Sequence, residues 1–240
     1  MKGVILAGGK GTRLYPLTKT LNKHLLPIGT EPMIYNPLRN MKACGVDEVR
    51  VVTSSEHMGQ IVSCLGSGSE FGLDLSYSVQ DEARGIADAL RRAESFVGRE
   101  SVLVLLGDNM FENPVDYFVD HFRTEQNERG ARVILTQVDE PVHFGIAALD
   151  ERNIVEIQEK PEHPKSNFAV VGAYIYDSRV FDFIRGSRPS ARGEYEITTI
   201  NNSYIELGEL RYDFVRGRWM DTGTFESYHE ANRLFFPRRQ

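Results

Sequence analysis

The sequence has only two cysteines, one tryptophan and no long apolar stretch, and these shortages exclude several classes of protein. Cys44 and Cys64 form no CxxC pair, which argues against a zinc site or a disulfide framework and predicts two buried thiols in a reduced cytoplasm. No apolar run approaches the roughly 20 residues that span a membrane, and glycines interrupt the first apolar run too early for a signal peptide. We therefore expect a cytoplasmic protein with no membrane partner.

Positive charge is also in the minority. The 28 lysines and arginines face 34 aspartates and glutamates, which gives a formal net charge of −6 at pH 7. General binders of nucleic acid or of membrane surfaces need a basic face, so we expect neither partner. The remaining composition, 41% hydrophobic and 26% charged, is typical of a globular protein with a substantial core.

Apolar runs alternate with helical patterns along most of the chain, which predicts βαβ units and a largely parallel sheet. The expected strands are 2–6, 49–53, 73–80, 102–106, 131–138, 145–149, 154–157, 169–176, 210–215 and 218–220, and the expected helices are 33–44, 59–65, 86–97, 113–128, 178–184, 197–207 and 225–235. Two helix starts are predicted from their cap residues, Asn113 before Pro114, and Ser178. No linker or repeat divides the sequence, so we predict one domain over 1–240.

The first strand ends in a glycine-rich loop with the sequence AGGKGTRL, from Ala7 to Leu14. Glycines permit positive φ and close approach of a ligand, and successive backbone N–H groups together with Arg13 suit phosphate oxygens. A tight turn in which the glycines only reverse the chain is the alternative. The spacing fits no P-loop, because no Gly-Lys-Ser/Thr follows, and no dinucleotide fingerprint, because Leu14 stands where its third glycine belongs.

The loop and several later segments, taken in order, resemble the motifs of sugar-1-phosphate nucleotidyltransferases. The later segments are 18–27 with 32–35, 79–80 with 85–87, 106–109, 159–161, 171–174, 192–198 and 219–224. The resemblance covers nearly the whole chain and is nearest to the short form of the members that use dTTP and glucose 1-phosphate. It implies a Rossmann-like three-layer αβα fold with a mixed, mostly parallel central sheet, in which residues 1–110 bind the nucleotide and residues 111–240 bind the sugar.

The implied reaction is direct attack of the phosphate of glucose 1-phosphate on the α-phosphorus of dTTP, with release of pyrophosphate and Mg²⁺ as cofactor. The product would be dTDP-glucose, the first step toward dTDP-deoxysugars such as rhamnose. Relatives that use UTP or CTP are one alternative, and a non-catalytic nucleotide-sugar-binding regulator is another. Catalysis is favoured because Arg13, Lys23, Asp108, Lys160 and Asp221 are all present. Assembly into a homo-oligomer is left open.

The resemblance also implies the roles of individual residues. The catalytic residues are Arg13, Lys23 and Lys160; the nucleotide-binding residues are Leu6, Ala7, Gly8, Gly9, Gly11, Thr12, Arg13, Lys23, Gln80, Gly85 and Asp108; the sugar-phosphate-binding residues are Asn109, Gly145, Glu159, Lys160 and Val171. Asp108 and Asp221 each follow a predicted strand and have no other evident partner, so we expect them to hold one Mg²⁺. An aspartate that only caps a turn, or a lysine that is only a solvated surface charge, is the alternative in each case.

Base recognition is expected from Gln80, whose amide can donate and accept at once. His24 stands where the long form has glutamine, which leaves a second base contact, and with it the choice between dTTP and UTP, open. Phe144 stands where the long form often has tyrosine, so one contact to a sugar hydroxyl is open too. The long form carries a further C-terminal helical region, and the subunit contacts and second, regulatory nucleotide site that depend on it are left open.

Overall fold

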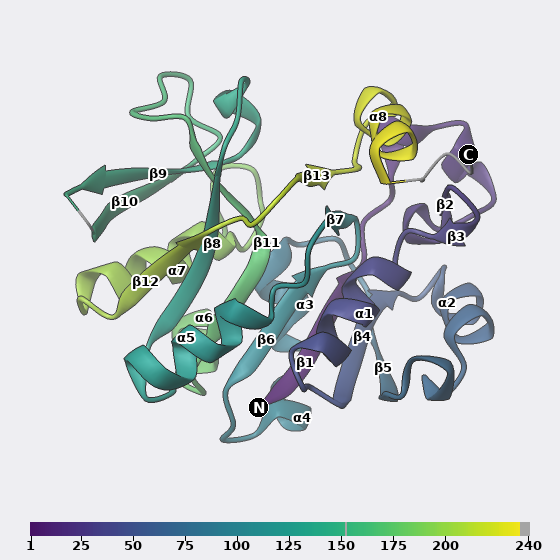
Figure 1. Ribbon diagram of the computed structural model, residues 1–240, viewed down its shortest axis with the longest axis horizontal. Coiled ribbons are helices and arrows are strands. Elements are labelled where there is room, and N and C mark those ends of the chain that lie inside the picture. Colours follow the sequence, from purple (N-terminus) through teal and green to yellow (C-terminus); the bar gives the residue numbers. More distant parts are fainter. Residues whose placement is uncertain (152, 236–240) are drawn as a thin grey trace.

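The computed structural model describes residues 1–151 and 153–235, and a nine-stranded sheet forms its centre (Figure 1). The strands are β1 (Lys2–Ala7), β2 (Pro27–Ile28), β3 (Glu31–Pro32), β4 (Glu48–Ser54), β5 (Asp74–Gln80), β6 (Val102–Leu106), β7 (Asn109–Phe111), β8 (Ala131–Gln137), β9 (Gly145–Asp150), β10 (Asn153–Glu159), β11 (Phe168–Tyr176), β12 (Leu210–Phe214) and β13 (Trp219–Asp221). The helices are α1 (Tyr35–Ala43), α2 (Met58–Leu65), α3 (Ile86–Arg91), α4 (Glu94–Val97), α5 (Asp116–Gln126), α6 (Val180–Gly186), α7 (Ile197–Glu206) and α8 (Phe225–Phe235).

The sheet is mixed, and most of its strands run the same way. The strands β5, β4, β1 and β6 are neighbours and all parallel, with Leu6 opposite both Val52 and Leu106. The next strand, β11, is antiparallel to β6, β8 and β9, and β8 in turn pairs with β12 in parallel. Among the described strands of this nine-stranded sheet, only β11 and β10 therefore oppose the common direction. The predicted α/β class with a mixed, mostly parallel sheet is confirmed.

Helices cover both faces of the sheet, so the fold has three layers. Figure 1 shows α1 and α5 in front of the sheet and α3, α6 and α7 behind it. Val4 and Leu6 of β1 point toward the layer behind, whereas Ile5 and Ala7 point toward the layer in front, as the two-residue period of a strand requires. The central strand β6 has the same alternation and is apolar on both faces, which is why its sequence is an uninterrupted apolar run.

A third, smaller apolar cluster attaches the C-terminal helix α8 to the segment that follows the glycine loop. Leu14, Leu26 and Met33 form its centre, and Ala231 of α8 packs against them. In Figure 1, α8 lies close to β2 and β3. The C-terminal part of the chain therefore supports the loop with which the chain begins.

Both predicted helix caps are wrong. Asn113 does not cap α5, because the helix begins only at Asp116; the Nδ2 of Asn113 donates instead to the carbonyl oxygen of Arg216 (3.2 Å). Ser178 does not cap α6, because the helix begins only at Val180; the preceding Asp177 accepts a hydrogen bond from the backbone N–H of Arg179 (3.1 Å), the residue just before the helix. In both cases the helix begins further along the chain than the local sequence pattern predicts.

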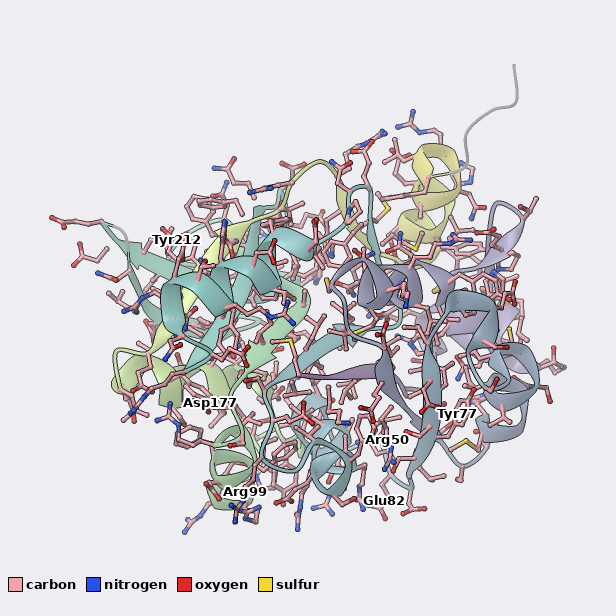
Figure 2. The ribbon with its side chains drawn as sticks, turned by 60° about the horizontal axis from the view of Figure 1, so that its bottom comes forward. Arg50, Tyr77, Glu82, Arg99, Asp177 and Tyr212 are labelled. Carbon is pink, nitrogen blue, oxygen red and sulfur yellow. The ribbon has the colours of Figure 1, made fainter. Side chains whose placement is uncertain are left out.

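Asp177 has several partners and anchors this corner of the molecule (Figure 2). Its carboxylate also accepts from the backbone N–H of Gly130 (2.8 Å) and the hydroxyl of Tyr204 (2.8 Å), so it joins α6 to α7 and to the start of β8. Both carboxylate oxygens of Asp177 thus accept hydrogen bonds from protein groups rather than facing a ligand. We therefore read it as a structural carboxylate.

Two further expectations need correction. The helix expected over 86–97 is interrupted between α3 and α4. The backbone N–H groups of Arg92 and Ala93 donate to the carbonyl oxygens three residues back, of Ala89 (3.1 Å) and Leu90 (2.9 Å), instead of four residues back as in an α-helix. Cys44 is buried as expected, but Cys64 is only partly buried. Among the described residues, no helix combines the length and the apolar character needed to cross a bilayer.

Candidate active site

The strands β1, β4, β5 and β6 are parallel, so their carboxyl ends meet at one edge of the sheet, where α/β proteins bind ligands. A cavity of about 260 Å³ lies at this edge. Of the residues predicted to bind the nucleotide, the cavity is lined by Leu6, Gly8, Gly9, Lys23, Gln80, Gly85 and Asp108. Segments far apart in the sequence thus converge where the motifs place the nucleotide.

The glycine loop curves over Lys23. Gly9 and Gly11 have φ of 89° and 60°, which a side chain rarely adopts. A Cβ on Gly11 would also lie 2.8 Å from Thr18 and 3.1 Å from the Cβ of Lys23, so glycine is required twice over. Thr18 holds the loop by donating its hydroxyl to the Gly11 carbonyl oxygen (2.8 Å).

The remaining loop residues lie outside the lining of the cavity. Ala7 is fully buried beneath it, and its carbonyl oxygen accepts the hydroxyl of Thr53 (2.9 Å). Thr12 and Arg13 are exposed. A Cβ on Gly223 would lie 2.9 Å from the Arg13 guanidinium, so Arg13 extends toward the turn that follows β13.

Lys23 and Asp108 form an ion pair on the wall of the cavity. Both side chains are largely buried, with exposed fractions of 15% and 11%. Burial alone would raise the pKa of Asp108, but the adjacent Lys23 ammonium outweighs it and holds that pKa well below its usual range. The expectation that Asp108 has no partner is therefore wrong, because a lysine 85 residues away in the sequence neutralises it.

Asp221 lies beside Asp108 because β13 pairs with β7, which places Asp221 opposite Asn109. The next residue, Thr222, donates its backbone N–H (3.0 Å) and its hydroxyl (2.7 Å) to the carbonyl oxygen of Asp108. Burial, and then the negative charge of Asp108, raises the pKa of Asp221 to about 6. Two carboxylates are thus held together, although like charges repel.

This pair is suited to a divalent cation. Within residues 1–151 and 153–235, no group of three or more His, Cys, Asp or Glu side chains has the arrangement of a complete protein cage. Mg²⁺ does not need such a cage, because it keeps several waters and takes one or two carboxylates together with substrate phosphates. The donor chemistry of Asp108 and Asp221 therefore fits Mg²⁺.

Gln80 lies at the end of β5 with its side-chain amide committed to the protein. Its Nε2 donates to the Asp88 carboxylate (2.9 Å) and to the Gly85 carbonyl oxygen (3.2 Å). Both N–H groups are used, so the expectation that Gln80 donates and accepts at once toward a base is wrong. Only its carbonyl oxygen remains for a ligand.

Gly85 must be glycine for two reasons. Its φ is 99°, and a Cβ at this position would lie 2.5 Å from the carbonyl oxygen of Tyr195. The backbone of Tyr195 reaches this point because its N–H donates to Arg84 (2.7 Å) while its carbonyl oxygen accepts from Ala87 (3.1 Å). Gly85 therefore joins the cavity to the 192–198 segment.

His24 is buried next to Lys23 and also lines the cavity. Its Nδ1 lies 2.7 Å from Oδ1 of Asn22, so this contact fixes the orientation of the ring. Burial, reinforced by the Lys23 charge, lowers the pKa of His24 to about 3, so the imidazole is neutral near pH 7. A neutral ring next to Lys23 adds no further positive charge to the site.

Three of the five predicted sugar-phosphate residues form a second cluster, with Glu159 at its centre. Its carboxylate accepts the hydroxyl of Thr198 (2.6 Å) and lies 3.7 Å from the Arg192 guanidinium and 4.0 Å from the Lys160 ammonium. A Cβ on Gly145 would lie 3.5 Å from the same carboxylate. The structure thus brings Gly145, Glu159 and Lys160 together.

The backbone of Lys160 is strained, with φ of 43° in a region that favours glycine. Its N–H donates to the carbonyl oxygen of Phe144 (2.9 Å), and the ring of Phe144 packs edge-to-face against Trp219 at 5.8 Å. Strain at a polar, half-exposed position is common at functional sites. The observation singles out Lys160 among the lysines.

Asn109 and Val171 are placed differently from what their predicted role needs. The side-chain oxygen of Asn109 accepts from Gly172 (2.9 Å) and Trp219 (2.8 Å), and its amide donates to Asp108 (3.2 Å). Asn109 is therefore a support for Asp108 rather than a free sugar ligand. Val171 is fully buried in the core in front of the sheet, so only its backbone could contact a ligand.

The sequence model of the family described as "Nucleotidyl transferase" matches residues 2–236, almost the entire chain. This chain belongs to the nucleotidyl transferase family.

Relatives of this nucleotidyl transferase carry a more specific name. This chain is 43% identical over 234 residues to the glucose-1-phosphate thymidylyltransferase of Neisseria meningitidis, and the match covers 96% of this chain and 81% of the relative. The enzyme of the same name from Mycobacterium tuberculosis is 38% identical with the same coverage.

Solved structures agree with the fold. A candidate glucose-1-phosphate thymidylyltransferase from Bacillus anthracis, crystallised with sucrose, is 51% identical and superposes with a TM-score of 0.92, covering 98% of this chain and 94% of that one. UDP-glucose pyrophosphorylase in complex with UDP-glucose is 25% identical, with a TM-score of 0.87 and 99% coverage of each chain.

Sequence reasoning missed part of the cavity of this nucleotidyl transferase. The further lining residues are His24, Ala83, Ile86, Ala89, Leu106 and Glu194. Glu194 is the one member from the second half of the chain, and Arg192 lies 3.1 Å from it and 3.7 Å from Glu159. Arg192 therefore links the cavity to the Glu159 cluster. The 192–198 segment resembles a family motif, but the motif by itself assigns no role to Arg192 or Glu194.

Proposed function

We propose that this nucleotidyl transferase transfers the thymidylyl group of dTTP to glucose 1-phosphate, forming dTDP-glucose and pyrophosphate. The names of relatives at 38–43% identity over 96% of the chain support this substrate pair. The observation that carries the proposal is the buried Lys23–Asp108 pair with Asp221 beside it, on the wall of a cavity under a glycine loop. Such a site offers a lysine ammonium that can bind the phosphates of a triphosphate and two carboxylates that can hold a metal ion beside them.

The nucleotide is assigned to residues 1–110. Their glycine loop offers backbone N–H groups, and Lys23 offers an ammonium that a phosphate can share with Asp108. Arg13, which is exposed and extends toward the turn after β13, is assigned to the leaving pyrophosphate, whose charge grows in the transition state. All cavity residues except Glu194 come from this half, which supports the division.

The sugar phosphate is assigned to residues 111–240. Lys160 would bind the phosphate, and Glu159 would accept hydrogen bonds from sugar hydroxyls, with Gly145 leaving room beside it. The hydroxyl of Thr198 donates to Glu159 (2.6 Å) and would orient its carboxylate toward the sugar, with the Arg192 guanidinium 3.7 Å away. The position of this cluster next to the cavity supports direct transfer between two bound substrates.

Asp108 and Asp221 would hold Mg²⁺, which stabilises the negative charge of the phosphates when bound. The remaining work is positioning and electrostatics, since phosphoryl-type transfer needs no protein nucleophile. Arg13, Lys23 and Lys160 together offset the repulsion between two anionic substrates. Both cysteines are free thiols, in keeping with reaction in the cytoplasm.

The test is a panel of triphosphates (dTTP, UTP, CTP, ATP) combined with several sugar 1-phosphates, followed by pyrophosphate release. We expect dTTP with glucose 1-phosphate to give the highest kcat/KM. Lys23→Ala should abolish turnover, whereas Lys19→Ala, at an exposed lysine four residues earlier in the sequence, should leave turnover unchanged. Absence of pyrophosphate release from every pair would refute the enzyme assignment, and a better pair would correct the substrates.

A further inference from the structure

The amide of Gln80 has one possible orientation in this structure. Asp88, as a carboxylate, and the Gly85 carbonyl oxygen are acceptors only, and both lie within hydrogen-bond distance of the same atom of Gln80, at 2.9 and 3.2 Å. That atom must be the nitrogen, because a carbonyl oxygen there would face two other oxygens. The assignment follows from the chemistry of the partners.

The Gln80 carbonyl oxygen is consequently directed to the cavity wall. A Cβ on Gly8, a lining residue, would lie 3.1 Å from this oxygen. Within the described part of the chain, no protein group donates to it. Gln80 thus presents a single acceptor, in a fixed place, on the wall of the cavity.

Asp88 is well placed to impose this orientation. It lies in the first turn of α3 and is buried, with only 4% of its surface exposed. One carboxylate oxygen accepts from Gln80, and the other lies 3.5 Å from the guanidinium of Arg92, one turn later on the helix. The bond to Gln80 is the shorter of the two, and the contact with Arg92 lies at the limit of hydrogen-bond distance, so the Gln80 amide is the main partner of the Asp88 carboxylate.

We propose that Asp88 is a positioning residue that holds the Gln80 carbonyl oxygen toward the cavity and so selects a pyrimidine with a ring N–H over one with a ring-nitrogen acceptor. The inference rests on the proposed function, because it takes the cavity to be the base site. Thymine and uracil carry an N3–H that can donate to this oxygen. Cytosine presents an N3 lone pair, which faces the oxygen lone pairs and leaves the buried carbonyl unpaired.

The selection depends on the carboxylate because an isolated glutamine amide can turn over and present its N–H groups instead. Gly85 alone offers one acceptor at 3.2 Å, whereas Asp88 adds a shorter, charge-assisted bond. Replacing Asp88 by an amide removes that constraint, since asparagine can donate as well as accept. Gln80 would then adapt to either base.

The experiment measures the Kd of dTTP and of CTP by titration calorimetry for the wild type and for Asp88→Asn, without sugar phosphate, so that no turnover is needed. We expect the wild type to bind dTTP more tightly than CTP. In Asp88→Asn the ratio of the Kd of CTP to the Kd of dTTP should fall by about tenfold or more, which is within the range of one buried hydrogen bond. Arg92→Met is the matched control. It removes the second partner of Asp88 and leaves the bond to Gln80, so the ratio should stay as in the wild type.

Catalytic measurements separate positioning from a general structural role. In Asp88→Asn, kcat at saturating dTTP and the KM for glucose 1-phosphate should change far less than the KM for dTTP. A wild type without preference, a ratio unchanged in Asp88→Asn, or an equal loss for both triphosphates would each overturn the proposal. Turnover of dTTP by the wild type is scored separately, so the proposed function can stand while this inference falls.

Asp88→Ala is the second variant, because alanine suits a helix and removes both carboxylate oxygens. Its Kd ratio should also fall, and an unchanged ratio overturns the proposal in the same way. If neither variant folds, as judged by circular dichroism and melting temperature, then the carboxylate supports the fold rather than base selection, which also overturns it.

Discussion

Thr222 donates two hydrogen bonds to one atom of Asp108, the backbone carbonyl oxygen, from its own N–H (3.0 Å) and its hydroxyl (2.7 Å). The two residues are 114 positions apart in the sequence, and Thr222 is fully buried. This contact brings Asp221 to Asp108, because Asp221 immediately precedes Thr222. The C-terminal part of the chain therefore completes a site that begins at the carboxyl end of β6.

We expect Thr222→Val to disturb this site while preserving the fold. The variant keeps the backbone N–H and most of the side-chain volume but loses the hydroxyl donor, which costs about 1 kcal/mol. Because the loss falls on the contact that aligns Asp221 with Asp108, activity should need a several-fold higher Mg²⁺ concentration for half saturation. The measurement is a Mg²⁺ titration of pyrophosphate release.

Thr222→Ser is its matched control, since serine retains the hydroxyl and should respond to Mg²⁺ like the wild type. A Thr222→Val enzyme with the wild-type Mg²⁺ response would show that the second hydrogen bond does not align the carboxylates.

Asp221→Asn should separate activity from stability. Turnover is expected to fall by orders of magnitude, because one of the two carboxylates that would hold the cation is lost. The melting temperature of the metal-free protein should rise, because the amide removes a negative charge held against Asp108, which together with burial raises the pKa of Asp221 to about 6.

Asp150→Asn, at an exposed carboxylate that ends β9, serves as control and should change neither quantity. Full activity of the wild type in excess chelator, or a lower melting temperature for Asp221→Asn, would contradict the assignment.

The regular elements of this fold were predictable wherever burial alone decides the local structure. The apolar run 102–106 became β6, and the alternation over 73–80 became β5, because each pattern reports which faces are covered. The caps at Asn113 and Ser178 were not predictable, because α5 begins only at Asp116 and α6 only at Val180, and the side chain of Asn113 contacts Arg216 instead. Where each helix begins depends on which segments meet, and a local pattern does not contain that information.

The site shows the same division. The glycine loop, Lys23 and the carboxylates were found from their motifs. The loop and Asp108 each follow a strand of the central sheet, whereas Lys23 begins a short 3-10 helix and Asp221 ends β13, which pairs only with β7 among the described strands. The Lys23–Asp108 pair and the orientation of the Gln80 amide could not be found this way, since each depends on a side chain from another element. Val171 was assigned to the sugar from its motif, although the alternation of β11 turns its side chain into the core.

Lys160 allows the charge and the backbone strain to be tested separately. Lys160→Ala and Lys160→Gly should both raise the KM for glucose 1-phosphate while leaving the Kd of dTTP nearly unchanged. Lys160→Gly should be the more stable of the two, by about 1 kcal/mol, because glycine tolerates the φ of 43° that alanine does not. Urea unfolding gives the difference.

Lys165→Ala is the control for the Lys160 variants, because this exposed lysine pairs with Glu156 and should alter neither substrate. Equal weakening of both substrates by Lys160→Ala would show that the lysine supports the fold or the metal instead.

His24 should make the protein lose stability as the pH falls. Burial lowers its pKa to about 3 in the folded state, whereas an unfolded histidine titrates near 6.5. Between these values the unfolded chain binds the extra proton, so the free energy of unfolding decreases as the pH drops from about 6.5 toward 3, by up to about 1.4 kcal/mol per pH unit. His24→Gln removes this group, so its free energy of unfolding should depend less steeply on pH in that window.

Urea unfolding at several pH values gives both slopes, and His143→Gln, at an exposed histidine, should keep the wild-type slope. An unchanged slope in His24→Gln would show that His24 is not held neutral by its surroundings.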